Sequence, residues 1–301
     1  MAKDVRGPVR QETFTRVLME ALPYIQSFYD RTIVLKYGGS TMTDPDLKDA
    51  FIKDVVLMHY VGIRLVVVHG GGPEITRMMR RLGKEAHFID GLRVTDRETV
   101  DITEMVLKGK VLQEIVASIN RAGGQAVGLS GKDGNLFTAR KLMAERPGSE
   151  GDLLDIGFVG EIDSVNADIL GTLDSRKFIP VISPLGVGPD GHTYNINADS
   201  VAGSIAGALG ATKLIMLTDT PGILRNESNP SSLISHLTLF ELRDLVAEKA
   251  ISGGMIPKVK ACETALQSGV EKAHIIDGRI PHSLLLEIFT DHGVGTEVVA
   301  N

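Results

Sequence analysis

Two glycine-rich turns, each directly after a short apolar stretch, are the segments of this chain best suited to chemistry. The first covers residues 36–40 (KYGGS) and the second covers residues 69–73 (HGGGP). Glycine lets the backbone approach a ligand closely, and a helix that begins after such a turn directs its N–H groups at an anion. Lys36 adds a positive charge at the end of the first apolar stretch. A lone lysine at this place usually lies at a sheet edge, but with two such turns we predict a site for a phosphoryl group.

A third glycine turn, residues 252–258 (SGGMIPK), opens an expected helix and ends in Lys258. Alone it indicates only the start of a helix, but beside Lys36 it supplies a second cation for a chain of phosphates. Residues 217–222 (LTDTPG) end another expected strand in a turn, which is where ligands bind in α/β sheets. Both segments therefore join the expected ligand site.

Arg93 lies in a glycine-led loop, residues 91–96 (GLRVTD), just before a helix that we expect to begin at Thr95 or Asp96. A lone arginine usually forms a surface salt bridge. An arginine in such a loop also suits the bidentate recognition of a carboxylate. The sequence leaves both interpretations open.

Three polar residues alternate along the next motif: Asn195, Asn197 and Asp199. They share one face if this segment is extended. Asp199 could instead cap the helix expected over residues 200–209. Two amides and a carboxylate on one face exceed what a cap needs, so we favour a binding site.

Several familiar sites are excluded by their context. Residues 186–191 (GVGPDG) match the glycine pattern of dinucleotide-binding folds, but no helix follows, so we expect a plain turn. No P-loop sequence is present. The eight histidines show no metal-ligand spacing, and Cys262, the single cysteine, cannot build a zinc site or a disulfide. We therefore expect no metal held by protein ligands.

These candidate groups require a scaffold of strands and helices. Apolar runs of strand length alternate with amphipathic stretches of helix length, which predicts an α/β fold with a mostly parallel central sheet sandwiched by helices. Their continuous Val, Ile and Leu content indicates burial on both faces. The expected core strands cover residues 33–36, 65–69, 126–129, 179–183, 214–218 and 273–277.

Residues 184–191, which are dense in turn formers, are the expected internal boundary. They divide the chain into an N-lobe, residues 31–185, and a C-lobe, residues 186–301. A linker of this kind permits hinge closure over a substrate. Residues 136–165 alternate around turn residues, as half-exposed hairpins do, so we expect these hairpins to form a lid or a rim.

Ahead of the first strand, residues 11–29 carry an apolar stripe with helical spacing. Pro23 is expected to kink or break this helix. The pattern does not say which surface covers the stripe, so packing on its own domain and docking on another subunit are equally open. Residues 1–30 are treated as a separate N-terminal segment.

Composition narrows the class of protein. Of 301 residues, 43% are hydrophobic and 23% are charged, which is typical of a soluble globular protein. The sequence contains no run of eighteen apolar residues, so we expect no membrane span. The net charge of −6 argues against a nucleic-acid partner. The N-terminus lacks the apolar core of a signal peptide, and a single cysteine fits a reducing compartment, so we expect a cytoplasmic protein.

Five motifs in this order resemble the amino acid kinase family: residues 36–39, 69–73, 195–199, 217–219 and 253–258. Residues 91–95 and the spacing of all the motifs are similar to the members that act on N-acetyl-L-glutamate in arginine biosynthesis. The resemblance implies the amino acid kinase fold. It also implies that ATP, with Mg²⁺ held mainly by its phosphates, phosphorylates the γ-carboxylate of N-acetyl-L-glutamate to give N-acetyl-L-glutamyl 5-phosphate.

The resemblance implies roles for individual residues. Lys36 would neutralise the transferring phosphoryl group, Lys258 would neutralise the phosphates on the ADP side, and Asp199 would orient both ammonium groups. The amino-acid substrate would be bound by Gly71, Gly72, Arg93, Asn195 and Asn197. The nucleotide would be bound by Gly38, Gly39, Thr218, Asp219, Gly222, Gly253, Gly254 and Met255. The alternatives are a kinase for another carboxylate, such as glutamate or a carrier-linked aminoadipate, and a non-catalytic ligand-sensing scaffold.

The N-terminal segment adds an expectation about regulation. Family members that arginine inhibits carry such a helix, which interlocks dimers into a ring. The resemblance therefore implies a homohexamer built as a trimer of dimers, with dimerisation through the N-lobe and arginine as inhibitor. It places the effector site at Tyr24, His274, Glu287 and Gly293, although His274 and Glu287 are otherwise ordinary residues near a sheet edge. The sequence is also similar to members that bind a PII-type signalling protein.

Overall fold

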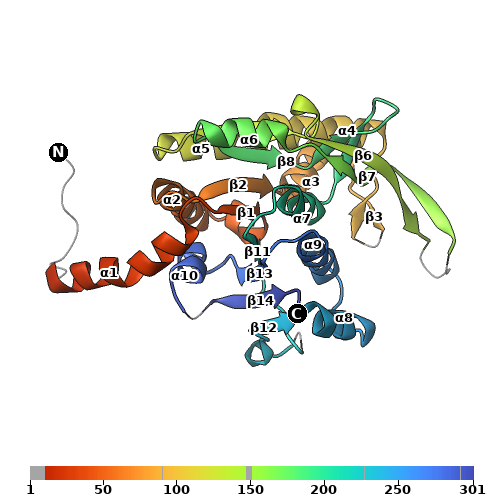
Figure 1. The fold of residues 1–301 in the computed structure, drawn as a ribbon. Coiled ribbons are helices and arrows are strands. Elements are labelled where there is room, and N and C mark those ends of the chain that lie inside the picture. The colour runs from red at the N-terminus through yellow and green to blue at the C-terminus, as the bar shows by residue number, and fades with distance from the viewer. Residues whose placement is uncertain (1–10, 90, 147–150, 227, 292) are drawn as a thin grey trace.

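An eight-stranded sheet runs through the computed structural model, and helices cover both of its faces (Figure 1). The structure describes residues 11–89, 91–146, 151–226, 228–291 and 293–301. All neighbouring strands are parallel except β13 and β14, which are antiparallel. In spatial order the strands are β12 (His236–Thr238), β14 (Gly295–Val299), β13 (Lys272–Asp277), β11 (Lys213–Thr218), β1 (Thr32–Tyr37), β2 (Arg64–His69), β8 (Ile179–Ser183) and β5 (Ala126–Ser130).

The six expected core strands are confirmed, and none differs from its expected range by more than one residue at either end. Their side chains alternate between two hydrophobic clusters, one on each face of the sheet. In β1, for example, Val34 belongs to one cluster while Ile33 and Leu35 belong to the other. The mostly parallel α/β fold with helices on both faces is therefore confirmed.

One face of the sheet is covered by three helices from the first half of the chain and by a short helix near the C-terminus. Phe51 of α2 stacks on Tyr37 of β1 with ring centroids 3.9 Å apart, and both side chains are buried. The helices on this face are α2 (Pro45–Tyr60), α3 (Gly72–Arg81), α5 (Leu112–Arg121) and α10 (Ser283–Ile288).

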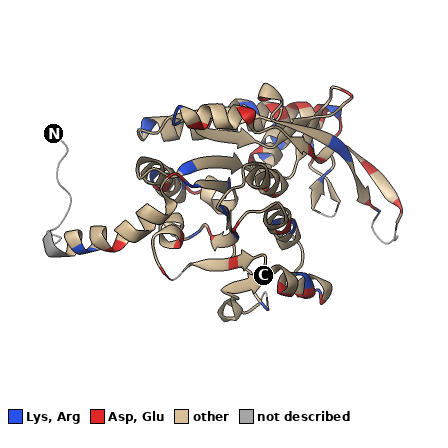
Figure 2. Cartoon of the chain, viewed as in Figure 1, with Lys and Arg blue, Asp and Glu red and all other residues tan. Residues whose placement is uncertain are grey.

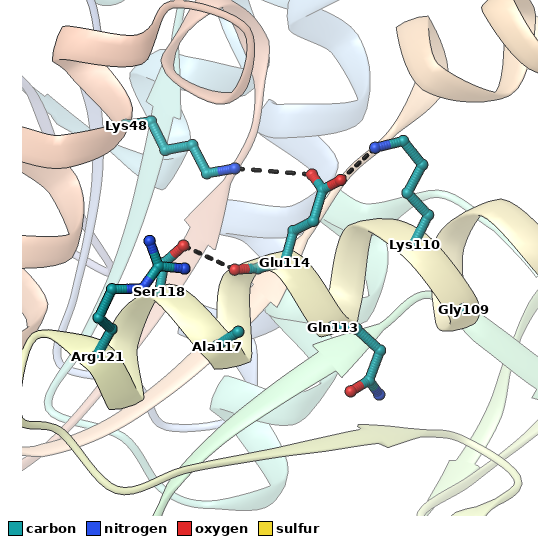
Figure 3. Close-up of a pocket in the computed structure, with 8 residues that line it drawn as sticks. All are labelled: Lys48, Gly109, Lys110, Gln113, Glu114, Ala117, Ser118 and Arg121. Atoms are coloured by element: carbon teal, nitrogen blue, oxygen red, sulfur yellow. Dashed lines mark hydrogen bonds and ion pairs between the residues drawn. The ribbon is translucent and has the colours of Figure 1, made fainter.

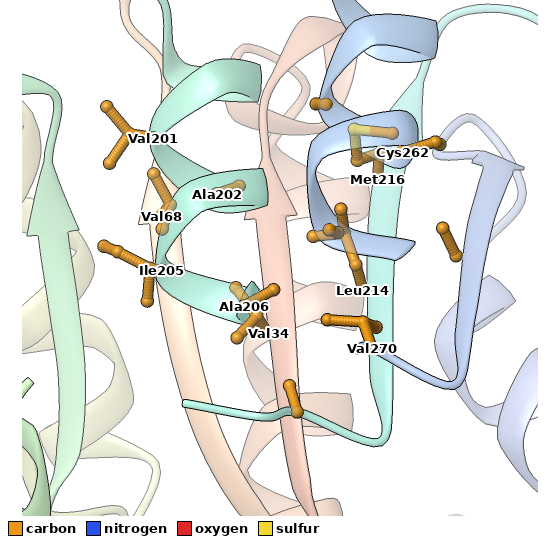
Figure 4. Close-up of a cluster of buried hydrophobic side chains, with 14 of the residues drawn as sticks. Val34, Val68, Val201, Ala202, Ile205, Ala206, Leu214, Met216, Cys262 and Val270 are labelled. Carbon is orange, nitrogen blue, oxygen red and sulfur yellow. The ribbon is translucent and has the colours of Figure 1, made fainter. Parts of the chain in front are cut away.

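The opposite face is covered by α7 (Ala198–Ala208), α9 (Met255–Gln267), α8 (Leu239–Ala247) and α6 (Asp168–Ser175). Figure 4 shows α7 lying over β1, β2 and β11, with Ala202 and Ile205 directed at the strands. Gly203 lets α7 approach α9 closely, because a Cβ atom there would lie 2.7 Å from the Ala261 carbonyl oxygen. This close packing brings the first turns of α7 and α9 together.

A long helix changes its geometry midway. It begins as α4 (Arg97–Glu104), continues as a π-helical segment η2 (Met105–Val111) and ends as α5. The N-cap of α4 is Asp96, whose side chain accepts a hydrogen bond of 2.8 Å from the Thr99 N–H. Short 3₁₀ turns occur at η1 (Gly39–Met42), η3 (Asp133–Asn135) and η4 (Pro230–Ser232).

The segment expected to form hairpins contains one long antiparallel hairpin, β6 (Phe137–Glu145) with β7 (Leu153–Val165). It closes into a small four-stranded barrel with β9 (Leu185–Val187) and β10 (Thr193–Ile196). A two-stranded ribbon, β3 (Phe88–Ile89) with β4 (Leu92–Arg93), lies beside it. Residues 184–191 are therefore not an open linker, because they contain β9 and the turn into β10. The expected turn at this glycine pattern is confirmed, since the chain passes from β9 into β10 without a helix between them. The division into two lobes stays a prediction.

The N-terminal helix α1 (Gln11–Phe28) extends away from the sheet (Figure 1). It continues through Pro23, so the expected break is absent. Its last turn is held by the domain, since Phe28 packs on the core, whereas Val17, Leu18 and Met19 are each more than half exposed. The chain's own domain therefore covers only the end of the apolar stripe. Within the described residues, no helix combines the length and the apolar character needed to cross a bilayer.

Candidate active site

A buried carboxylate pairs with two ammonium groups at the centre of the molecule. Lys36 Nζ lies 3.0 Å from Asp199 Oδ1, and Lys258 Nζ lies 2.9 Å from Asp199 Oδ2. Lys36 belongs to β1, Asp199 to the first turn of α7 and Lys258 to the first turn of α9. Their side chains are only 10%, 7% and 13% exposed, respectively. Three segments far apart in the sequence thus converge on one charged group.

The charges of this triad favour an anionic ligand. Burial would raise the pKa of Asp199, but the Lys36 and Lys258 ammonium groups outweigh burial and lower that pKa. Asp199 is therefore ionised, and two ammonium groups around one carboxylate leave a local excess of positive charge. Such an excess, fixed in a site of low exposure, suits a chain of phosphates.

Asp199 does not cap the helix, which was the structural alternative. The N-cap of α7 is Asn197, whose Oδ1 accepts hydrogen bonds from the N–H groups of Asp199 (2.8 Å) and Ser200 (3.3 Å). Because Asn197, two residues earlier, provides the cap, the Asp199 carboxylate can pair with the two lysines.

The first glycine turn supports the triad. A Cβ atom at Gly38 would lie 2.6 Å from Lys36 Nζ, so any other residue there would displace the ammonium group from its position over this turn. The Asp219 carboxylate, from the turn after β11, accepts a 2.7 Å hydrogen bond from the Ser40 N–H. Gly39 lies against the same carboxylate with φ of +70°. The structure thus joins the 36–40 and 217–222 motifs through Asp219.

The second glycine turn is tied to the first, since the Gly70 N–H donates a 2.8 Å hydrogen bond to the Tyr37 carbonyl oxygen. Burial lowers the pKa of His69 to about 4, and Nδ1 of this neutral ring lies 2.7 Å from the Gly70 carbonyl oxygen. Gly71 is required because a Cβ atom there would lie 2.4 Å from Leu107 Cδ2, from the π-helical segment. Sequence reasoning gave His69 and Leu107 no part in shaping this turn.

A cavity of about 190 Å³ opens beside the second turn. It brings together all five residues predicted to bind the amino-acid substrate. Its wall also contains apolar residues that the sequence did not single out, because isolated apolar residues carry no motif. The lining consists of Gly70, Gly71, Gly72, Ile75, Phe88, Gly91, Leu92, Arg93, Leu107, Val159, Pro184, Asn195, Ile196, Asn197 and Ala198.

Arg93 is a buried residue of this cavity rather than half of a surface salt bridge. Its guanidinium donates hydrogen bonds to the Gly72 carbonyl oxygen (3.0 Å) and to Thr76 Oγ1 (2.8 Å), and it lies 4.7 Å from the centre of the Phe88 ring. Burial lowers its pKa. All of these partners are neutral, so the positive charge remains available to a carboxylate.

Strand β7 holds the Arg93 loop in place. The Thr95 N–H donates a 2.9 Å hydrogen bond to the Ile156 carbonyl oxygen, and the Phe158 N–H donates a 2.6 Å bond to the Thr95 carbonyl oxygen. Between them lies Gly157 with φ of +87°, where a Cβ atom would lie 2.1 Å from the same Thr95 oxygen. The hairpin therefore forms a rim of the cavity, as expected.

A second cavity, of about 530 Å³, includes Lys258 of the triad in its lining. Five of the residues predicted to bind nucleotide line it, while Gly38, Gly39 and Asp219 lie outside this lining. The lining consists of Thr218, Thr220, Gly222, Ile223, Leu224, Ala250, Ile251, Ser252, Gly253, Gly254, Met255 and Lys258.

Comparison with known proteins identifies the family. The model of the amino acid kinase family matches residues 31–277. The chain belongs to the amino acid kinase family. Among its relatives, the acetylglutamate kinase of Syntrophobacter fumaroxidans is 58% identical over 286 residues, covering 94% of this chain and 95% of that protein. The acetylglutamate kinase of Moorella thermoacetica is 57% identical over 287 residues, covering 95% of this chain and 97% of that protein.

Solved structures of two other proteins share the amino acid kinase fold. N-acetylglutamate synthase from Neisseria gonorrhoeae, complexed with coenzyme A and N-acetyl-glutamate, has a TM-score of 0.82 at 27% identity. The match covers 96% of this chain, which spans only 64% of the synthase. Carbamate kinase from Giardia lamblia bound to AMP-PNP has a TM-score of 0.65 at 16% identity, covering 89% of this chain and 98% of that one. The second likeness concerns the fold alone.

The expected effector residues of this amino acid kinase lie away from the triad. His274 Nδ1 lies 2.6 Å from Glu287 Oε1, and Gly293 lies close enough that its Cβ atom would be 2.9 Å from Glu287 Oε2. Burial lowers the pKa of His274 against the opposing effect of Glu287. Lys213 Nζ, which the sequence did not single out, lies 3.0 Å from His274 Nε2. Tyr24 instead donates a hydrogen bond to Asp291.

Strand β13, which carries His274, lies inside the sheet between β11 and β14, so the alternative that placed it near a sheet edge is wrong. Binding of arginine here stays a prediction. Across the described ranges, no group of three or more His, Cys, Asp or Glu side chains is arranged to hold a metal ion.

Proposed function

We propose that this chain transfers the γ-phosphoryl group of ATP to the γ-carboxylate of N-acetyl-L-glutamate. The products are ADP and N-acetyl-L-glutamyl 5-phosphate, and the reaction belongs to arginine biosynthesis. The observation that carries the proposal is the Lys36–Asp199–Lys258 triad beside two cavities, one of which carries the unpaired charge of Arg93. Relatives named acetylglutamate kinase, 57–58% identical over nearly the whole chain, support this choice of substrate.

The proposed reaction depends on positioning and charge rather than on proton transfer. The attacking γ-carboxylate is already ionised at neutral pH, so it needs no general base. Phosphoryl transfer has a loose transition state whose charge lies on the peripheral oxygens. Lys36 neutralises that charge on the transferring group, Lys258 neutralises the phosphates of the leaving ADP, and Asp199 keeps both ammonium groups in place.

The backbone completes the arrangement. N–H groups of Gly38 and Gly39 bind the phosphoryl oxygens from one turn, and those of Gly71 and Gly72 bind them from the other. Arg93 binds the α-carboxylate of the amino acid, while Asn195 and Asn197 bind its acetamido group. ATP lies in the 530 Å³ cavity against Thr218, Gly222 and the 253–255 turn. Mg²⁺ would accompany ATP, held mainly by phosphates and water, and would reduce the negative charge of the phosphate chain.

The lining of the smaller cavity favours the acetylated amino acid over free glutamate. No Asp or Glu belongs to that lining, all of whose residues are described. The α-ammonium of glutamate would lose its water there without gaining an anionic partner, which is costly. The neutral acetamido group meets two side-chain amides instead. This observation weighs against the alternative of a glutamate kinase.

Trapping the acyl phosphate with hydroxylamine tests the proposal. With ATP and Mg²⁺, N-acetyl-L-glutamate should give a hydroxamate, whereas glutamate and aspartate at equal concentration should give at least tenfold less. If hydroxamate forms from glutamate as fast as from N-acetyl-L-glutamate, the result would support the alternative, a kinase that acts on another carboxylate. Binding of arginine or substrate by calorimetry, without any turnover, would support the ligand-sensing scaffold.

We further propose that arginine inhibits this reaction and that the chain forms a hexamer, a trimer of dimers, through α1. The exposed Val17, Leu18 and Met19 offer an apolar surface that a second copy can cover. A PII-type protein is a further proposed partner on the ground of the resemblance alone. Repeating the hydroxamate assay with arginine, together with light scattering, tests the first two points.

A further inference from the structure

A third cavity, here called the outer cavity, adjoins the amino-acid cavity. It has a volume of about 510 Å³ and is lined by Gly72, Pro73, Thr76, Arg77, Arg80, Phe88 and Arg93. Gly72, Phe88 and Arg93 line both cavities. The stacked Phe88 ring and Arg93 guanidinium, 4.7 Å apart, therefore form a partition between an inner and an outer space.

The outer cavity holds three guanidinium groups and no carboxylate in its lining. Arg93 has only neutral partners. Arg77 lies 3.3 Å from Glu74, one turn earlier on α3. Arg80 forms no ion pair with any residue in the described part of the chain. The outer cavity is thus locally cationic in a protein whose net charge is −6.

Another surface cavity differs from the outer cavity in how its cations are paired. Basic and acidic residues are interspersed along the ribbon (Figure 2). The cavity of about 580 Å³ drawn in Figure 3 also contains Lys48, Lys110 and Arg121. There, however, Glu114 pairs with Lys110 and lies 3.7 Å from Lys48. The single carboxylate of that cavity thus contacts two of its three cations, whereas in the outer cavity only Arg77 has a carboxylate partner, Glu74, which does not line the cavity.

We propose that the outer cavity is a capture site for the anionic amino-acid substrate. Arg77 and Arg80 attract the dicarboxylate and hold it beside Arg93 before it passes Phe88 into the inner cavity. A surface patch of one sign raises the local concentration of an oppositely charged ligand, while the protein as a whole would repel it. This inference rests on the proposed function, since it needs a substrate with two negative charges.

The test measures KM for N-acetyl-L-glutamate at several salt concentrations in the full-length protein. Arg77→Gln combined with Arg80→Gln should raise KM about fivefold at 20 mM KCl and less than about twofold at 500 mM, because the Debye length shrinks from roughly 20 Å to roughly 4 Å. The effect should appear in KM rather than in kcat, because neither side chain contacts the triad. Replacing Arg80→Gln in the double variant by Arg80→Lys returns one positive charge to the cavity. The low-salt KM should then fall most of the way back to that of the parent protein.

Arg81→Gln is the matched control, since Arg81 ends the same helix and does not line the cavity. It removes a charge without changing the capture site, so KM should follow that of the parent protein. The α-amide of N-acetylglutamate, with one negative charge, should show a smaller loss than the dicarboxylate. If the double variant and Arg81→Gln give the same low-salt KM, the capture site is refuted. If the parent protein gives no hydroxamate at all, the proposed function fails instead.

Discussion

The Asp199 carboxylate is the group whose removal tests the triad most directly. Asp199→Asn keeps the size of the side chain but removes the charge that Lys36 and Lys258 face at 3.0 and 2.9 Å. At about 3 Å and an effective dielectric constant of about 20, each pair represents roughly 5 kcal/mol of gross Coulomb attraction. Desolvation offsets much of this, and removing one partner of a buried pair typically costs roughly 3–5 kcal/mol. We expect a loss of that size in the free energy of unfolding.

A triphosphate should compensate for the missing carboxylate. In Asp199→Asn, two ammonium groups face each other, and a bound nucleotide supplies the negative charge that they lack. A nonhydrolysable ATP analogue should therefore raise the Tm of this variant more than it raises that of the parent protein. The two ammonium groups are no longer oriented, so kcat should fall at least about a hundredfold, equivalent to roughly 2.7 kcal/mol.

Asp54→Asn is the matched control for this experiment. Asp54 is also a buried carboxylate, but it lies on α2 beside His282 and lines neither the inner nor the nucleotide cavity. Its Tm should respond to the ATP analogue as the parent protein does, and kcat should be unchanged. Turnover of Asp199→Asn within threefold of the parent, with no extra stabilisation by the analogue, would refute the role of the triad.

Three further outcomes follow from named contacts. In Gly38→Ala the new methyl group would lie 2.6 Å from Lys36 Nζ and displace that ammonium group, so kcat should fall at least tenfold with little change in Tm. Arg93→Ala removes a charge-assisted pair worth about 1.5–3 kcal/mol, so KM for the amino acid should rise about 10- to 100-fold; an unchanged KM would mean that the substrate binds elsewhere. Burial raises the pKa of Asp54 to about 6 despite its contact with His282, so the folded protein binds this proton more tightly than the unfolded chain, whose pKa is about 3.9. The free energy of unfolding should therefore fall by up to about 3 kcal/mol as pH rises from 4 to 6, and urea titrations of Asp54→Asn should lack this slope.

The sheet could be predicted from the sequence because its central strands are continuous apolar runs. Apart from the hairpin of residues 136–165, strands without such runs were not predicted. β12 has only three residues, and β14 places the polar Thr296 and Glu297 in the middle of the strand. Likewise, the turn formers of residues 184–191 suggested a linker, whereas the three-residue β9 within them is buried by its barrel partners.

The charged residues of the site could also be predicted, because lysines next to glycine-rich turns can be recognised in the sequence by residue type and spacing. The residue that caps α7 could not be predicted, because Asn197 and Asp199 are both good caps. Only the structure shows that Asn197 is the one used. Leu107 and Phe88 escaped notice for another reason. Apolar residues in a cavity wall look like core residues until the chain is folded.

The shape of the inner cavity depends on the number of residues in the π-helical segment η2, because Leu107 of this segment lines the cavity. A π segment corresponds to one residue more than an α-helix of the same span would hold. Deleting one residue between Met105 and Val111 would restore regular α geometry over the same span, so the two flanks would keep their direction while the residues inside the segment would take new positions around the helix. Leu107 would then turn away from Gly71, or Lys108 from Asp133, with which it now forms a 3.0 Å ion pair. Deleting one codon in this segment, far in the sequence from Lys36 and Lys258, should thus change the shape of the inner cavity. Every residue predicted to bind the substrate would keep its identity.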